Sequence, residues 1–243
     1  MPVVKSNKSL SAALCIFAVI ETVLGVLLQT LGGRAVPITC FASVVLACLF
    51  CTLFAEKTAD YLLTQLALVC TVSADFFLLI TPERQQLPAM LFFSVTQLAY
   101  FLRIWRGDEN GTRKKWHLAV RAAASVLAVA LTFAVLGEKT DAVAAVSMFY
   151  YANLLTNIVF AFACFEKPGI LAVGLVLFAL CDALIGMAFL DGYLPIAADS
   201  VIYKIIHPGF DLAWAFYLPA QALLAASLAP RRFKENKKSK KLN

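Results

Sequence analysis

The chain has 243 residues, of which 61% are hydrophobic and 15% are charged, and its mean hydropathy is +0.81. A soluble domain carries about 25% charged residues, so the composition excludes an ordinary soluble fold and indicates an integral membrane protein. Seven basic residues lie within 231–243 and supply most of the net charge of +6. This tail is expected to set topology and to meet anionic lipid head groups, and no binding of nucleic acid is predicted.

Eight apolar runs follow one another along the chain, separated by charged residues or by Gly and Pro. Each is about 19–25 residues long, enough to cross a hydrocarbon layer about 30 Å thick as an α-helix. The predicted spans are 10–31, 36–55, 59–80, 87–105, 116–136, 141–165, 169–190 and 209–229. The sequence therefore predicts an all-α membrane protein, with residues 1–243 as one transmembrane domain. We expect an eight-helix bundle around one polar cavity, followed by a basic cytoplasmic tail at 231–243.

The distribution of Lys and Arg predicts the orientation of the bundle. With eight spans, the two terminal segments and the second, fourth and sixth loops share one side of the membrane, and they hold sixteen of the 21 basic residues. The opposite side holds four. Because cytoplasmic segments are enriched in Lys and Arg, both termini are expected in the cytoplasm, in a multi-pass protein of the cell membrane. Arg121 is expected to extend back to the cytoplasmic interface from the start of the fifth span.

Two aspartates lie in otherwise apolar stretches, Asp75 in "VCTVSADFFLLI" and Asp182 in "VLFALCDALIGMAF". Both belong to spans that run outward, about 24 and 20 Å from the cytoplasmic ends at about 1.5 Å per residue. Similar depth allows the two carboxyls to meet in the outer half of the membrane. An ionised carboxylate facing lipid is costly, so both are expected to face the bundle interior, where they are the candidate catalytic residues.

Other polar residues fall on the remaining spans and are candidates to line the same cavity. The candidate substrate-binding residues are Gln97, Tyr100, Asn153, Tyr217 and Gln221. Asn153, four residues before Asn157, is equally well explained by hydrogen bonds between helices. The role of Glu21 is left open between structural pairing and a part in the cavity. His207 is expected in a turn at the outer surface.

Paired carboxyls support two classes of function. Crowded into one low-dielectric site, they cannot both ionise easily, so one can act as a general acid while the other orients or deprotonates water. This arrangement suits hydrolysis of a lipid-soluble substrate, and it also suits a proton-coupled transporter of small molecules or lipids. No metal site or other cofactor is predicted, because the only histidines, His117 and His207, cannot build a three-histidine zinc site.

Short motifs give the chain a resemblance to a known family. The acids stand in "SADFFLL" and "LCDALIG", and the last span contains "YLPAQALLAAS", Tyr217 to Ser227. Two further matches are "VPIT" from Val36 and "QLAY" from Gln97. In order and spacing these resemble the YhhN family of lysoplasmalogenase-type membrane hydrolases, whose versions read GDxxL, SDxxLA, YxxAQxLIxxS, KPLT and HxxY. The chain resembles a divergent member, since Val36 and Gln97 replace the family Lys and His.

The resemblance implies an eight-span fold and an ether hydrolase without metal or cofactor. Its substrate would be a lysophospholipid, the lysoplasmalogen, whose vinyl-ether bond is cleaved to a fatty aldehyde and a glycerophospho-base. Asp75 and Asp182 would supply the acid and the base. Gln97 cannot titrate, so hydrogen bonding alone remains at the family His position.

Overall fold

A computed structural model describes residues 7–31, 33, 35–54, 57–83, 85–107, 114–164, 169–207 and 210–228. All regular elements in these ranges are helical. The predicted tail at 231–243 lies outside the described residues. The long helices are α1 (Asn7–Leu31), α2 (Ala35–Phe54), α3 (Ala59–Asp75), α4 (Gln86–Gly107), α5 (Lys114–Leu136), α6 (Ala142–Cys164), α7 (Gly169–Leu190) and α9 (Leu212–Ala226). Shorter elements are the π-helical turn η1 (Phe76–Ile80), the 3-10 turn η2 (Gly137–Lys139) and α8 (Val201–Ile206).

Seven helices in the described part of the chain are long and apolar enough to cross a membrane. They overlap the first seven predicted spans, so the chain is an all-helical, multi-pass membrane protein. The helix over the eighth predicted span, α9, is apolar but has 15 residues, below the roughly 17–25 that a spanning helix needs. The eighth crossing therefore stays a prediction.

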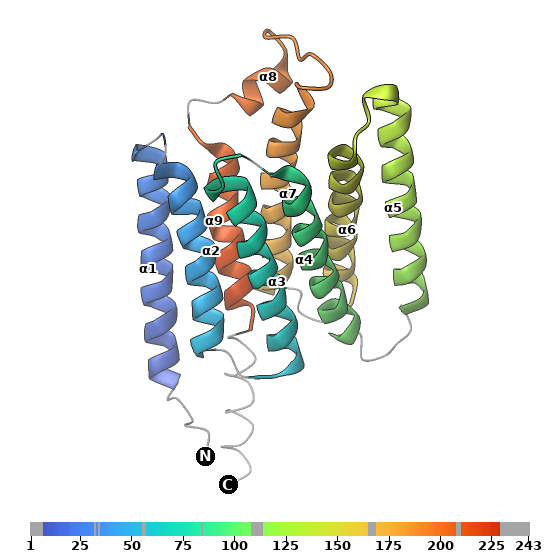
Figure 1. Ribbon diagram of the computed structural model, residues 1–243. Helices are drawn as coiled ribbons and strands as arrows, with labels where there is room; N and C mark the ends of the chain where they lie inside the picture. The colour runs from blue at the N-terminus through green and yellow to red at the C-terminus, as the bar shows by residue number, and fades with distance from the viewer. Residues whose placement is uncertain are drawn as a thin grey trace.

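The helices form a bundle whose two outermost members are α1 and α5 (Figure 1). In its most apolar window α5 is 11% buried, compared with 39% for α6, and α5 packs mainly against α6. The inner helices pack in the pairs α7–α9, α3–α4, α4–α6 and α2–α9. The start of α1 and the end of α9 lie at the same end, the lower one in Figure 1, and α8 lies beyond the opposite, upper end. Both ends of the bundle keep these names below.

Local sequence explains where several helices begin and end. The hydroxyl of Thr58 accepts a hydrogen bond from the backbone N–H of Tyr61 at 3.2 Å and caps the start of α3. Asp141 does the same for α6, accepting from the N–H of Ala144 at 2.7 Å. Gly137, at φ 56°, follows α5 in the left-handed conformation that glycine adopts at low cost. Gly137 and Asp141 thus define the connection between α5 and α6 at the upper end of the bundle, and Thr58 defines the start of α3 at the lower end (Figure 1).

One close contact between helices involves Gly174 on α7. A Cβ built there would lie 3.0 Å from Cγ of Leu224 and 3.3 Å from the carbonyl oxygen of Ala220, both on α9. We therefore expect Gly174→Ala to lower the free energy of unfolding by about 1–3 kcal/mol through overpacking. Gly186, also on α7, has no atom within 4 Å of such a Cβ, so Gly186→Ala is the matched control.

Thermal unfolding of the purified protein in one detergent measures both effects. A melting temperature that falls for Gly174→Ala but holds or rises for Gly186→Ala agrees with the packing. Equal melting temperatures for the two variants would contradict the close approach of α7 and α9.

Candidate functional site

The two aspartates occupy different environments. Asp75 is the last residue of α3, is 2% exposed and is followed directly by the π-helical turn η1. Such turns widen a helix locally and often occur at functional sites. Asp182 lies on α7 and is partly exposed. Asp75 is therefore enclosed by protein, whereas Asp182 is the more accessible of the two.

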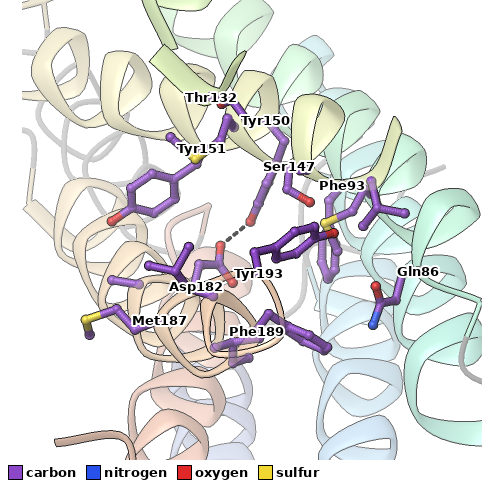
Figure 2. A pocket seen from close by; sticks show the side chains of 18 of the residues that line it. Gln86, Phe93, Thr132, Ser147, Tyr150, Tyr151, Asp182, Met187, Phe189 and Tyr193 are labelled. Atoms are coloured by element: carbon purple, nitrogen blue, oxygen red, sulfur yellow. Dashed lines mark hydrogen bonds between the residues drawn. The ribbon is translucent and has the colours of Figure 1, made fainter. Parts of the chain in front are cut away.

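Each aspartate accepts a hydrogen bond from a tyrosine on another helix. The hydroxyl of Tyr217, on α9, donates to Oδ2 of Asp75. The hydroxyl of Tyr150, on α6, donates to Oδ2 of Asp182, and Figure 2 shows this bond with the tyrosine ring directed at the carboxyl. In each case a phenol donates to Oδ2, and no hydrogen bond to Oδ1 is found among the described residues.

A frame of aromatic rings links the two tyrosine–aspartate pairs. Phe178, one turn before Asp182 on α7, packs edge-on against Tyr217 with ring centroids 5.8 Å apart. It also packs against Phe93 at 5.9 Å, and Phe93 contacts the ring of Tyr150 at 5.5 Å. Aromatic packing of this kind fixes ring positions. The hydroxyls of Tyr150 and Tyr217 are thus oriented by one shared set of buried rings.

Both carboxyls line one cavity of about 500 Å³. Its walls come from α3, α4, α5, α6, α7 and α9, and most of the lining is apolar (Figure 2). The sequence predicted a polar cavity. The structure instead combines an apolar chamber with a small polar group, formed by Asp75 and Asp182 with their tyrosines. This volume falls in the range of about 300–1,000 Å³ that is usual for small-molecule sites.

The wall on the side of α5 faces the surroundings of the bundle. Leu131 and Val135 line the cavity and are 51% and 62% exposed. Met148 of α6 and Phe189 of α7 also line it and are 38% and 43% exposed. Since α5 is a peripheral apolar helix of a multi-pass membrane protein, we expect this side of the cavity to face lipid.

A short segment beyond α7 adds polar contacts at the upper end of the cavity. Tyr193 lines the cavity, and its hydroxyl donates to Oδ2 of Asp141 at 3.0 Å. Lys139 Nζ donates to the carbonyl of Tyr193 at 2.8 Å. Partial burial, together with the hydrogen bond to Asp141 and its charge, raises the pKa of Tyr193, which keeps the phenol protonated as a donor. These bonds connect the end of α7 to the start of α6.

Of the five candidate substrate-binding residues, Tyr217 lines the cavity and the other four are buried outside its lining. Gln97, Tyr100 and Gln221 are each 0% exposed. The amide of Asn153 donates to Ser125 Oγ at 3.1 Å. Contact of these four residues with substrate stays a prediction.

Arg121 does not extend back to the membrane interface as the sequence suggested. It is 9% exposed and donates from Nη1 to Oδ1 of Asn153 and from Nη2 to Oδ1 of Asn157. Its guanidinium also lies 4.3 Å from the ring centroid of Phe101. The two asparagines thus hold a buried arginine between α5 and α6, which is a structural task.

Three other residues raised by the sequence lie away from the cavity lining. Glu21 accepts a hydrogen bond from Ser43 Oγ at 2.6 Å, which joins α1 to α2 and supports the structural interpretation. His207 follows α8 and stacks on Tyr203, with ring centroids 4.2 Å apart. Val36 packs against the hydrophobic core at the start of α2.

Sequence reasoning missed Tyr150, Phe178 and Tyr193. Tyr150 lies three residues before Asn153 on the same helix, a spacing that places both on one face, and this signal was available. Phe178 and Tyr193 carry no such signal, because aromatic residues are common in apolar helices. Among the described residues, no group of three or more His, Cys, Asp or Glu side chains is placed to hold a metal ion.

Comparisons with known proteins agree with the resemblance in the motifs. The model of the YhhN family matches residues 40–228, which include both aspartates and both tyrosines bound to them. The comparison with curated proteins gave no match, and the comparison with solved structures gave none.

Proposed function

Because the chain belongs to the YhhN family, we propose that it is a lysoplasmalogenase-type hydrolase that cleaves the vinyl-ether bond of lysoplasmalogens by paired-aspartate catalysis. The observation that carries the proposal is the cavity, which holds two tyrosine-bound carboxyls in an apolar chamber with exposed apolar residues on its α5 side. A single alkenyl chain would fit against the apolar walls, and the two aspartates with their tyrosines would contact the vinyl-ether bond.

The reaction needs one proton donor and one proton acceptor. Protonation of the β-carbon of the vinyl ether forms an oxocarbenium ion, and the oxygen of a water molecule adds to its carbon while the water proton passes to a carboxylate. The resulting hemiacetal breaks its C–O bond to the glycerol oxygen, which takes the proton that the second carboxyl received from water, while the hemiacetal hydroxyl gives its own proton to the carboxylate that first protonated the lipid. The products are a fatty aldehyde and a glycerophospho-base, and both carboxyl groups return to their starting forms.

The different exposure of the two acids supports distinct roles. Asp182, partly exposed to the cavity, is assigned as the acid that protonates the lipid. Asp75, 2% exposed, is assigned as the base that receives the water proton, because the hydrogen bond from Tyr217 offsets part of the cost of burying its ionised form. The tyrosine hydroxyls keep Oδ2 of each group occupied, so that Oδ1 is directed to the reaction.

Lateral entry of the lipid is supported by the exposed wall at α5. The alkenyl chain would pass between α5 and α7, past Leu131 and Val135. Its head group would remain at the upper end near Tyr193. Because the walls do not contact the reacting atoms, they select for one apolar chain and leave the head group only weakly specified.

Four lipids with the same head group test this proposal: three lysolipids, with a vinyl ether, a saturated ether or an acyl ester, and one two-chain plasmalogen. The vinyl-ether compound should yield aldehyde, whereas the saturated-ether compound should be inert, because protonation of its chain cannot form an oxocarbenium ion. A two-chain plasmalogen should react at least about tenfold more slowly, since the second chain has no apolar wall to occupy. Hydrolysis of the saturated ether, or of an acyl ester, at the vinyl-ether rate would contradict the assigned chemistry.

A further inference from the structure

Helices α4 and α9 run in the same direction beside the candidate site (Figure 1), and contacts at two levels relate their positions. At the lower end, Arg103 Nη1 on α4 donates to Oγ of Ser227, 124 residues later in the chain, at 2.7 Å. Nearer the upper end, Phe178 packs against both Phe93 of α4 and Tyr217 of α9. Phe93 and Tyr217 have the same separation in the chain, 124 residues, as Arg103 and Ser227. The constant separation keeps equivalent positions of the two helices at one level.

The same separation places Gln97 level with Gln221, one helical turn below Phe93 and Tyr217. Both glutamines are 0% exposed, as is Tyr100 in the next turn of α4. Four polar atoms of these side chains have no hydrogen-bond partner among the described residues: Gln97 Nε2, Tyr100 Oη, and both Nε2 and Oε1 of Gln221. Buried polar groups are seldom left without a partner, and ordered water commonly supplies one.

The orientation of the Gln97 amide follows from its neighbours. Arg121 can only donate, so Asn157 turns its Oδ1 to the guanidinium and its Nδ2 to Oε1 of Gln97, at 2.9 Å. Gln97 is therefore left with an N–H₂ group directed elsewhere. Gln221 offers a donor and an acceptor, and the hydroxyl of Tyr100 offers both.

This set of groups matches water. A cation is disfavoured by the N–H₂ group of Gln97, and an anion by the carbonyl oxygen of Gln221, whereas water both donates and accepts. None of the three residues lines the lipid cavity. Gln221 lies four residues after Tyr217 on the same face of α9, and Tyr217 donates to Asp75.

We propose that Gln97, Tyr100 and Gln221 hold buried water between α4 and α9, and that this site supplies the water which Asp75 activates. The second part rests on the proposed hydrolase function, and the first does not. Lipid and water then reach the reacting centre from different sides, the lipid past α5 and the water from the lower interior. Such separation keeps the alkenyl chain out of the water site and orients the water before the oxocarbenium ion forms.

Radiolytic hydroxyl-radical labelling of the full chain in detergent tests the water site without any substrate. Bound water generates radicals where it sits, so Tyr100 should be labelled although it is buried. Phe50, 6% exposed and stacked on Phe17, is the dry control. Gln97→Leu and Gln221→Leu should each reduce labelling of Tyr100, and melting temperatures check that both variants fold. Labelling of Tyr100 no greater than that of Phe50 in the unmodified protein would overturn the proposal.

Kinetics of the same variants test the use of the water. Gln221→Leu should lower kcat by roughly 10²-fold, as expected for a misplaced reactant, with KM for the lysolipid unchanged. Gln97→His, which replaces the amide with an imidazole that can also form hydrogen bonds, should keep most of the activity. A raised KM with unchanged kcat would mean that Gln221 contacts lipid, and would overturn the supply role. If Tyr100 is labelled but the unmodified protein hydrolyses no lysolipid, the hydrolase proposal fails and the water site stands.

Discussion

Replacement of either aspartate by asparagine is expected to reduce aldehyde release by about 10²–10⁴-fold, the range usually attributed to general acid–base catalysis. Asp75→Asn and Asp182→Asn each retain the shape of the side chain and remove the proton equilibrium. The carboxamides can still accept hydrogen bonds from Tyr217 and Tyr150 through their carbonyl oxygens. Folding should survive, since a neutral amide costs less to bury than an ionised acid.

Glu21→Gln is the matched control for these variants. Glu21 is also a buried carboxyl, 7% exposed and bonded to Ser43, but it is absent from the cavity lining. Initial rates of aldehyde release should therefore fall for the two aspartate variants and hold for Glu21→Gln. Wild-type rates in both aspartate variants would remove the paired-acid mechanism.

Gly186→Phe is expected to have the second largest effect, a loss of at least about tenfold in kcat/KM for long-chain lysolipids. Gly186 lines the cavity one turn after Asp182, and a Cβ there meets no atom within 4 Å. The added ring can therefore enter the cavity without disturbing the bundle. The ring would compete with the alkenyl chain for the apolar space, so substrates with shorter chains should lose less activity.

Val173→Phe controls for the insertion of a phenyl ring into α7. Val173 is 47% exposed and is absent from the cavity lining. Rates measured over a series of chain lengths should depend on length for Gly186→Phe and match the unmodified protein for Val173→Phe. A Gly186→Phe variant with full activity on every chain length would mean that the lipid binds elsewhere.

The inward orientation of the two aspartates was predictable from sequence, because a carboxyl in an apolar helix is costly unless it faces the bundle interior. The positions of the helices were predictable because a chain that crosses lipid must satisfy its backbone hydrogen bonds within the segment. A long apolar run in a membrane protein is therefore almost always a helix. Burial alone does not reveal the partner, however. Tyr150 and Tyr217 bond the two acids from separate helices, and such pairing depends on helix rotation, which length and hydropathy leave open.

Arg121 shows why the role of the polar residues was harder to predict. Its position near the start of a span is typical of a side chain that extends to the interface, yet it turns inward to Asn153 and Asn157. Burial of the two asparagine side chains opposes this tendency, because a buried carbonyl oxygen without a hydrogen-bond donor costs free energy and the guanidinium supplies the donors. The π-helical turn after Asp75 is likewise a tertiary feature, for which "DFFLLI" gives no local signal.

The orientation of the bundle remains a proposal with clear support. The start of α1 and the end of α9 lie at the same end (Figure 1), as expected for an even number of crossings. The sixteen-to-four distribution of Lys and Arg assigns that end to the cytoplasm. On this assignment the aspartates lie nearer the outer face, and the lysolipid enters from the outer leaflet.

The most direct test of the central claim is aldehyde release from a pure lysoplasmalogen by the purified full chain in detergent, with a metal chelator present. We predict one fatty aldehyde and one glycerophospho-base for each lipid consumed, and at least about 10²-fold slower release by Asp75→Asn and by Asp182→Asn. Absence of aldehyde from the unmodified protein, combined with proton-coupled uptake into proteoliposomes that both variants lose, would contradict the hydrolase and identify a transporter.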